Sequence, residues 1–221
     1  MTNALTITDR VAEMHATMEA QPTNEVMGAF RREQHELAAG GVPDGIAAAG
    51  TVVADVALLD AHGAATALYA AAGDVASVVV FYRGAWCPYC NIALATYQAQ
   101  LLPQLTKRGV RLLAISPQTP DGSLSMQEKN DLTFNVLSDP GNVLAGRLGI
   151  LTRPSDEAHA AQLQLGLDLT AVNADATITL PLPTTMILDA GHVLRWIDVH
   201  PDYSTRSEPQ QILDALDRVS L

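Results

Sequence analysis

Cysteines and basic residues are scarce in this 221-residue chain. It contains two cysteines, and its 13 lysines and arginines are outnumbered by 24 aspartates and glutamates, which leaves a formal net charge of −11. A surface of this charge is repelled by the phosphates of nucleic acids and by anionic membranes. We therefore expect no nucleic-acid partner and no membrane-surface binding.

Long hydrophobic runs are also absent from the sequence. No stretch of about 18 uninterrupted apolar residues occurs, so no membrane span is expected. The first ten residues lack the basic start and apolar centre of a secretory signal. We expect a cytoplasmic protein, and in that reducing compartment a structural disulfide is the less favoured use of two thiols.

Both cysteines fall in a single C-x-x-C motif. Trp86 precedes the motif, and Pro88 and Tyr89 lie between Cys87 and Cys90. No second cysteine pair exists and the six histidines are scattered, so the spacing disfavours a zinc site, and no metal or other cofactor is predicted. The motif favours redox chemistry, with a purely structural thiol pair as the alternative.

The first 44 residues are expected to form a helical arm and a linker that precede a single domain over residues 45–221. Apolar residues of the arm recur at mostly helical intervals, and Pro22 and Asn24 are expected to divide it into two amphipathic helices. Such an arm either packs on the core of its own chain or forms a homodimer contact.

From residue 50 onward, short apolar runs alternate with helical segments. Residues 52–59 indicate a strand pair or an extended segment, and residues 77–82 a buried central strand. A helix over 88–105 and a strand over 110–116 follow. This β-α-β unit implies parallel strands joined by a right-handed crossover.

The second half of the chain is expected to complete a mixed sheet. The pattern predicts helices over 123–131, 142–148 and 209–221, a strand over 135–137, and a hairpin of strands over 184–189 and 192–198. Residues 151–180 read as an insertion with a helix over 155–165. This insertion either covers the cysteine pair and shapes a substrate pocket or elaborates the surface.

This order of elements, with the cysteine pair at a strand-to-helix junction, resembles the thioredoxin fold. The resemblance implies an α/β protein with a mixed central sheet flanked by helices, here with an N-terminal helical extension. At a helix N-terminus, unpaired N–H groups and the helix dipole favour a thiolate, so Cys87 is expected to be the more exposed, attacking sulfur. Cys90 would be the buried sulfur that resolves a mixed disulfide. Pro88 suits the first helical turn because the donor it lacks would be unpaired there.

The same resemblance assigns a role to Pro183 and Thr184. Thioredoxin-like proteins carry a cis proline at the start of such a strand, facing the cysteine pair. If Pro183 is that residue, its preceding carbonyl and the neighbouring backbone lie open to pair with an extended disulfide partner. The alternatives are an ordinary trans proline at the start of an edge strand, or Pro181 in this place.

Over about residues 50–221 the chain resembles the peroxiredoxin superfamily, in the alkyl hydroperoxide reductase and thiol-specific antioxidant (AhpC/TSA) sense. The resemblance rests on the opening segment 53–56, the Leu-Ser-Asp at 137–139, and the Thr-Thr-Met-Ile-Leu-Asp at 184–189 with Gly191. It implies a thiol-dependent peroxidase that reduces hydroperoxides through a dithiol-disulfide cycle. An external thiol reductant, such as thioredoxin or a low-molecular-weight thiol, would then restore the dithiol.

The chain departs from the family pattern at the site itself. Aligned on the family's Pro-x-x-x-Thr-x-x-Cys motif, Cys90 takes the peroxidatic position, Cys87 replaces the threonine and Arg83 replaces the proline. The family's peroxide-polarising arginine falls on Pro183, so a group that activates the O–O bond is expected to be lost. Arg83 is expected either to lower a thiol pKa or bind an anion, or to be an ordinary solvated residue.

Three functions therefore stay open. A peroxiredoxin-like thiol peroxidase is favoured because the resemblance spans most of the chain. A thioredoxin-like protein disulfide oxidoreductase would use the same pair with Cys87 as the attacking sulfur. A non-enzymatic redox sensor is the third, and the N-terminal arm is the feature that favours it.

Overall fold

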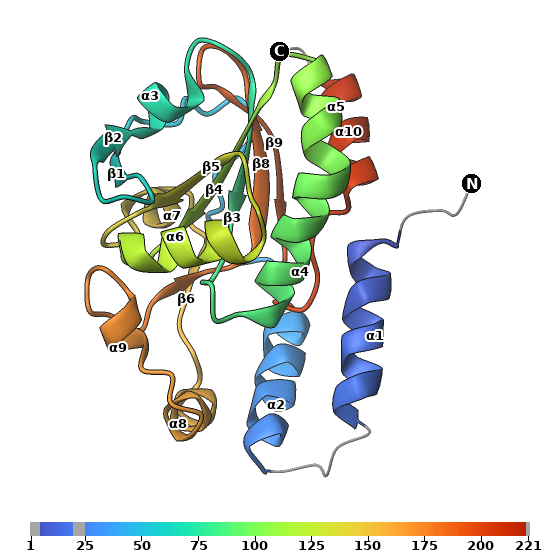
Figure 1. Ribbon diagram of the computed structural model, residues 1–221, viewed down its shortest axis with the longest axis vertical. Helices are drawn as coiled ribbons and strands as arrows, with labels where there is room; N and C mark the ends of the chain where they lie inside the picture. Colours follow the sequence, from blue (N-terminus) through green and yellow to red (C-terminus); the bar gives the residue numbers. More distant parts are fainter. Residues whose placement is uncertain (1–4, 20–24, 220–221) are drawn as a thin grey trace.

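The computed structural model describes residues 5–19 and 25–219 (Figure 1). A seven-stranded mixed sheet lies at its centre, with the strand order β2-β1-β5-β4-β3-β8-β9. The strands of this sheet are β1 (Ala57–Leu59), β2 (Ala65–Ala67), β3 (Ser77–Phe81), β4 (Arg111–Ser116), β5 (Asn135–Ser138), β8 (Thr184–Leu188) and β9 (Leu194–Val199). A separate two-stranded sheet pairs β6 (Leu151–Thr152) with β7 (Leu180–Pro181).

The strands β3, β4 and β5 are parallel to one another, and β8 and β9 continue the sheet as an antiparallel hairpin. Every residue of β3 is buried, because helices cover both faces of the sheet at this strand. Its side chains alternate between the two faces: Val78 and Val80 belong to one core cluster, and Val79 and Phe81 to the other. The predicted β-α-β unit and hairpin are thus confirmed.

Helices on one face of the sheet share a core cluster with the dithiol. This face carries α4 (Pro88–Thr96), the π-helical turn η1 (Tyr97–Leu101), α5 (Leu102–Lys107), α6 (Pro120–Lys129) and α10 (Pro209–Arg218). The opposite face is covered by α3 (Leu68–Ala72) and α7 (Val143–Arg147). Figure 1 shows α4, α5 and α10 along one side of the sheet. The sequence predicted one helix over 88–105, and the structure inserts the π turn within it.

The N-terminal arm consists of α1 (Ile7–Glu19) and α2 (Glu25–Gly40), and the predicted break at Pro22 and Asn24 lies outside the described residues. The arm lies at the end of the sheet where α4 begins (Figure 1). The Glu208 carboxylate accepts hydrogen bonds from the backbone N–H groups of Ile7 and Thr8, at 2.9 and 2.8 Å. An anion in this position suits the unpaired donors of a helix N-terminus.

The second helix of the arm packs against α8 (Asp156–Gln164), the helix predicted within the 151–180 segment. The buried Glu33 accepts a hydrogen bond from the backbone N–H of Ser155 at 2.8 Å. Together with the contacts of α1, this places the arm on the core of its own chain, as one of the two alternatives predicted. A homodimer and the division of the chain at residue 44 stay predictions.

The strand pair predicted over 52–59 is wrong in part. Only β1 has strand geometry there, and Val52 forms an isolated bridge with Val193. Asp55 explains the interruption, because its carboxylate accepts hydrogen bonds from the backbone N–H groups of Val56 and Tyr69 and thereby turns the chain. The short elements β2, α3, β6, β7 and α9 (Leu169–Val172) were not predicted. No helix within the described residues is long and apolar enough to cross a membrane.

Candidate active site

The C-x-x-C motif lies at the junction between β3 and α4, and hydrogen bonds of the connecting loop fix its position. Cys87 is the residue before the first helical turn, and Pro88 occupies that turn, as predicted. The Cys87 carbonyl accepts hydrogen bonds from the backbone N–H groups of Cys90 and Asn91. The Asn91 side chain donates to the carbonyls of Ala85 and Cys87, both at 2.8 Å. The loop before the helix is thereby held against its first turn.

Both cysteines are free thiols and both are buried. Cys87 is 1% exposed and Cys90 is 0% exposed. The prediction that Cys87 would be the more exposed sulfur is confirmed only in order, because both thiols are buried and Cys87 alone of the two borders a cavity. In a thioredoxin-like domain without such additions, the residue before this helix would face solvent. Here the N-terminal arm and the 151–180 segment lie over Cys87.

Cys90 is the sulfur that faces a positive charge. Its Sγ lies 3.1 Å from Nη2 of Arg206, which donates to it, and accepts a longer hydrogen bond of 3.4 Å from the backbone N–H of Arg83. Arg206 is 6% exposed, and no carboxylate of the described residues lies within ion-pair distance of it. A buried guanidinium needs an anion nearby, and the Cys90 sulfur is in position to be that anion.

The two thiols are driven to opposite protonation states. Burial raises the pKa of Cys90, but the hydrogen bond from Cys87 and the charge of Arg206 outweigh it and lower that pKa to about 5. Burial and the hydrogen bond to Cys90 raise the pKa of Cys87 well above its usual value. The contact with Arg206 therefore favours the thiolate on Cys90. The expectation that the helix N-terminus places the thiolate on Cys87 stays a prediction, and the contacting guanidinium opposes it in this buried site.

Arg206 was not predicted from the sequence. It lies in the loop between β9 and α10, and no spacing relates it to the C-x-x-C motif. Its Nη1 donates to the carbonyls of Tyr203 and Thr205, at 2.7 and 2.6 Å. The hydroxyl of Tyr97, in the π turn, donates to the neighbouring carbonyl of Ser207 at 2.6 Å. These bonds hold the loop so that the guanidinium points at Cys90.

Pro183 and Thr184 differ from their predicted roles. No peptide bond in the described residues is cis. The carbonyl before Pro183, that of Leu182, accepts a hydrogen bond from the Thr184 hydroxyl, and the Pro183 carbonyl accepts one from the backbone N–H of His200. Pro183 is thus a trans proline, which was the alternative, and the carbonyls on both sides of it are already paired, so the condition for docking of an extended disulfide partner there is not met. A positive charge was expected to be missing from the site, because Pro183 stands where the family has an arginine. Arg206 supplies a positive charge at the dithiol instead.

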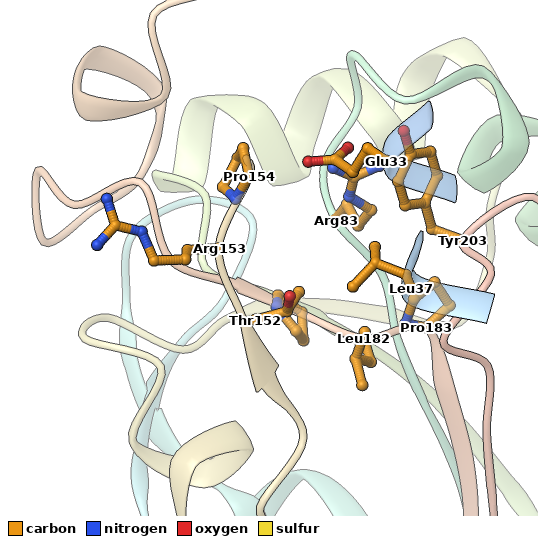
Figure 2. Close-up of a pocket in the computed structure, with 10 residues that line it drawn as sticks. Glu33, Leu37, Arg83, Thr152, Arg153, Pro154, Leu182, Pro183 and Tyr203 are labelled. Atoms are coloured by element: carbon orange, nitrogen blue, oxygen red, sulfur yellow. The ribbon is translucent and has the colours of Figure 1, made fainter. Parts of the chain in front are cut away.

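Arg83 is buried rather than solvated, with 5% of its surface exposed. Its guanidinium carbon lies 3.8 Å from the ring centroid of Tyr203 and 5.3 Å from that of Trp86. Figure 2 shows Arg83, Tyr203 and Glu33 gathered on one side of a small pocket that Pro183 also lines. The positive charge of Arg83 also acts to lower the pKa of both cysteines.

A larger cavity of about 330 Å³ opens in front of Cys87. Three groups of residues line it: Arg83, Trp86, Cys87, Pro88, Tyr89 and Tyr203 around the motif; Met18, Met27, Phe30 and Gln34 from the arm; and Gln162, Leu165 and Leu167 from the 151–180 segment. Cys90 is not among the lining residues. The 151–180 segment thus lines a cavity together with Cys87, which agrees with the first alternative for that segment, while its role as a substrate pocket stays a prediction.

Tyr89 ties the motif to both helices of the arm. Its hydroxyl lies 2.9 Å from Nε2 of His15 in α1 and accepts a hydrogen bond of 3.1 Å from the Gln34 amide in α2. The rings of His15 and Tyr89 also meet edge to face. Tyr89 is thus a packing residue and, at the same time, the contact through which the arm closes one end of the cavity.

A buried dithiol at the strand-to-helix junction of a thioredoxin-like mixed sheet defines the class of thiol-disulfide oxidoreductases. Comparison with protein families narrows this class, because the model of the AhpC/TSA family matches residues 49–197, which is well over half of the chain. The chain therefore belongs to the AhpC/TSA family and is a peroxiredoxin-like oxidoreductase. The arm lies before the matched segment.

Solved structures show the same fold. The peroxidoxin BcpB of Mycobacterium tuberculosis aligns with a TM-score of 0.59 at 19% identity, over 78% of this chain and 98% of its own. Reduced Prx3 of Vibrio vulnificus in complex with hydrogen peroxide gives 0.62 at 18% identity, over 77% and 99%. The bacterioferritin comigratory protein of Xanthomonas campestris gives 0.54 at 18%, over 73% and 90%. A search of curated protein sequences gave no match.

The protonation states can be measured directly. We expect ultraviolet thiolate absorbance of the reduced protein to rise once, with a midpoint near pH 5, as Cys90 ionises, and to show no second rise until above pH 9. Near neutral pH the protein would then carry one thiolate per chain. In a Cys90→Ser variant the transition near pH 5 should vanish, and its persistence there would place the thiolate on Cys87.

Proposed function

We propose that the protein is a thiol-dependent peroxidase in which the Cys90 thiolate attacks the hydroperoxide and Cys87 resolves the product. The observation that carries this proposal is the buried contact between Cys90 and Arg206. Only a thiolate is an effective nucleophile toward a peroxide oxygen, and the low pKa of Cys90 keeps it ionised at neutral pH. Family membership supports the same reaction.

In the first step the Cys90 sulfur attacks the terminal oxygen of the hydroperoxide. The S–O bond forms as the O–O bond breaks, sulfur loses two electrons, and the departing alkoxide takes a proton to leave as an alcohol, or as water when the substrate is hydrogen peroxide. The Arg206 guanidinium, next to the reacting sulfur, stabilises the negative charge that moves onto the departing oxygen. Arg83 adds a second positive charge to the site.

In the second step the Cys87 thiol attacks the Cys90 sulfenic acid. An S–S bond forms, and water leaves with the oxygen that came from the peroxide. Cys87 borders the cavity whereas Cys90 lies behind it, so an external thiol reaches the Cys87 sulfur first. Two thiol equivalents, from thioredoxin or a low-molecular-weight thiol in the reducing cytoplasm, then restore the dithiol.

A second candidate function, disulfide reduction, rests on the position of Cys87 at the cavity. Because Cys87 is the sulfur at the cavity, it is also placed to attack an incoming disulfide, with Cys90 releasing the product. The raised pKa of Cys87 opposes this order, since it keeps the attacking sulfur protonated near neutral pH. A redox sensor would use the same oxidation without sustained turnover.

Stoichiometry under anaerobic conditions tests the proposal. Each reduced chain is expected to consume one equivalent of hydroperoxide, lose two free thiols and regain them when a dithiol is added. Sustained peroxide consumption with excess dithiol then distinguishes an enzyme from a sensor. Reduction of a model disulfide without any peroxide consumption would contradict the peroxidase and favour the second candidate.

A further inference from the structure

Two buried residues of opposite charge lie at the small pocket of Figure 2, Glu33 from the arm and Arg83 from the loop between β3 and α4. Glu33 is 4% exposed and Arg83 is 5% exposed. A buried charge is costly unless an opposite charge or hydrogen bonds compensate it. The two opposite charges therefore favour an interaction across this pocket.

Each of the two residues also has a buried atom without a hydrogen-bond partner. Oε1 of Glu33 accepts the hydrogen bond from the backbone N–H of Ser155, but Oε2 has no partner among the described residues. Nε of Arg83 is likewise unpaired. Because buried polar atoms are rarely left unpaired, an acceptor and a donor at one pocket point to a partner that both share.

The pocket has room for one water molecule. Its volume is about 10 Å³, and a buried water needs a space of roughly 10–15 Å³ and at least two polar partners. Glu33 and Arg83 form no direct ion pair in the described part of the chain. A water molecule between them accepts a hydrogen bond from Nε and donates one to Oε2, which is nearly as favourable as a direct hydrogen bond.

We propose that Glu33 is a positioning residue of the dithiol, and that its carboxylate holds the Arg83 guanidinium through one bound water molecule in this pocket. The Tyr203 ring, 3.8 Å from the guanidinium carbon, holds it from another side. The proposal rests on the proposed function, in which Cys90 is the attacking thiolate, and adds to the site a residue from outside the segment that matches the family.

The other titratable groups at the pocket do not take this role. Arg153 is exposed and points away from Arg83 in Figure 2. Burial raises the pKa of Tyr203 far above its usual range, so its hydroxyl is neutral. Glu33 is thus the one carboxylate among the described residues that line the pocket. At the sulfur itself, Arg206 is the larger positive influence and Arg83 the smaller one.

Neutralising Glu33 tests the proposed role. The Glu33→Gln variant keeps an oxygen that accepts from Ser155 but removes the charge, which releases the Arg83 guanidinium toward the thiolate. We expect the midpoint of Cys90 ionisation, measured by ultraviolet absorbance, to fall from near pH 5 by about 0.5–1 unit. Glu36→Gln makes the same charge change at an exposed position of the same helix and should leave the midpoint unchanged.

An Arg83→Met background distinguishes a positioning role from a direct charge effect. In that background the Glu33→Gln substitution should change the midpoint much less, because the residue through which Glu33 acts is gone. An equal fall in both backgrounds, or no fall with Arg83 present, would overturn the proposal. The titration needs no turnover, so absence of peroxide consumption by the wild type would overturn the peroxidase without altering this readout.

A crystal structure of the reduced wild type gives a second readout that does not depend on the folding of a variant. One ordered water within hydrogen-bond distance of both Oε2 of Glu33 and Nε of Arg83 is expected. A dry pocket, or a water that contacts only one of the two atoms, would overturn the proposal.

Discussion

Replacing Arg206 by methionine is expected to slow the reaction of the protein with hydroperoxide by about 10²–10³-fold, the usual cost of removing one donor that stabilises developing negative charge. Two effects contribute. The Cys90 pKa rises from about 5 toward its ordinary value, so less thiolate is present near neutral pH, and the guanidinium 3.1 Å from the sulfur no longer stabilises the departing oxygen. Stopped-flow measurement of thiol oxidation over a range of pH separates the two, because only the first effect is recovered at high pH.

The Arg206→Met variant also leaves the carbonyls of Tyr203 and Thr205 without this donor, at a cost of about 1–3 kcal/mol for the buried bond to Tyr203 and less for the bond to the exposed Thr205. Thermal unfolding and the thiolate titration therefore accompany the kinetics, and an Arg206→Lys variant, which keeps the charge, should recover part of the rate. Arg153 is exposed and points away from Arg83 and Tyr203 in Figure 2, so Arg153→Met is the matched control. A folded Arg206→Met protein with unchanged rate and unchanged Cys90 pKa would contradict the assigned role.

Replacing Cys87 by serine is expected to reduce steady-state peroxidase turnover to background while leaving one stoichiometric reaction with hydroperoxide. Serine cannot form the disulfide, so the Cys90 sulfenic acid has no internal partner and accumulates. The Cys90 thiolate keeps its contact with Arg206 in this variant. A burst of one equivalent of alcohol per chain, followed by no further release, is the measured signature.

The same variant also tests the order of the two sulfurs along the cavity. Cys87 lies at the cavity surface and Cys90 behind it, so a hydroperoxide passes Cys87 on its way to the thiolate. A Cys87→Ala variant opens this path but also loses the side-chain donor that lowers the Cys90 pKa, so its burst should be at least as fast as that of Cys87→Ser only at a pH where Cys90 is ionised in both variants. Loss of the burst in both Cys87 variants would show that Cys87 is required for the attack itself.

The sequence predicted those features whose signals are local. The β-branched run of β3 and the helical spacing of apolar residues after Pro88 correctly predicted a strand-to-helix junction at the dithiol. Both patterns can be recognised within a short stretch of sequence. The two arm helices and α8 followed from the same periodicity. Segments that resemble the family, such as residues 184–189, supported the prediction of a mixed sheet.

The features that required three-dimensional structure were those that depend on contacts between distant residues. Cys90 and Arg206 are 116 positions apart, and nothing in the sequence of the loop marks this arginine among the 13 basic residues. The protonation order of the two cysteines depends on that contact, which a rule based on the helix N-terminus alone does not include. The cavity likewise joins residues of α1, α2 and the 151–180 segment that only tertiary packing brings together.

The most direct test of the central claim is to locate the first oxidised sulfur. Each of the reduced Cys87→Ser and Cys90→Ser variants receives one equivalent of hydroperoxide in the presence of dimedone, and mass spectrometry of peptides identifies the labelled residue. Cys90 should be labelled rapidly in Cys87→Ser, and Cys87 should react no faster than a free thiol in Cys90→Ser. Rapid labelling of Cys87 in Cys90→Ser, with Cys90 unlabelled in Cys87→Ser, would contradict the account.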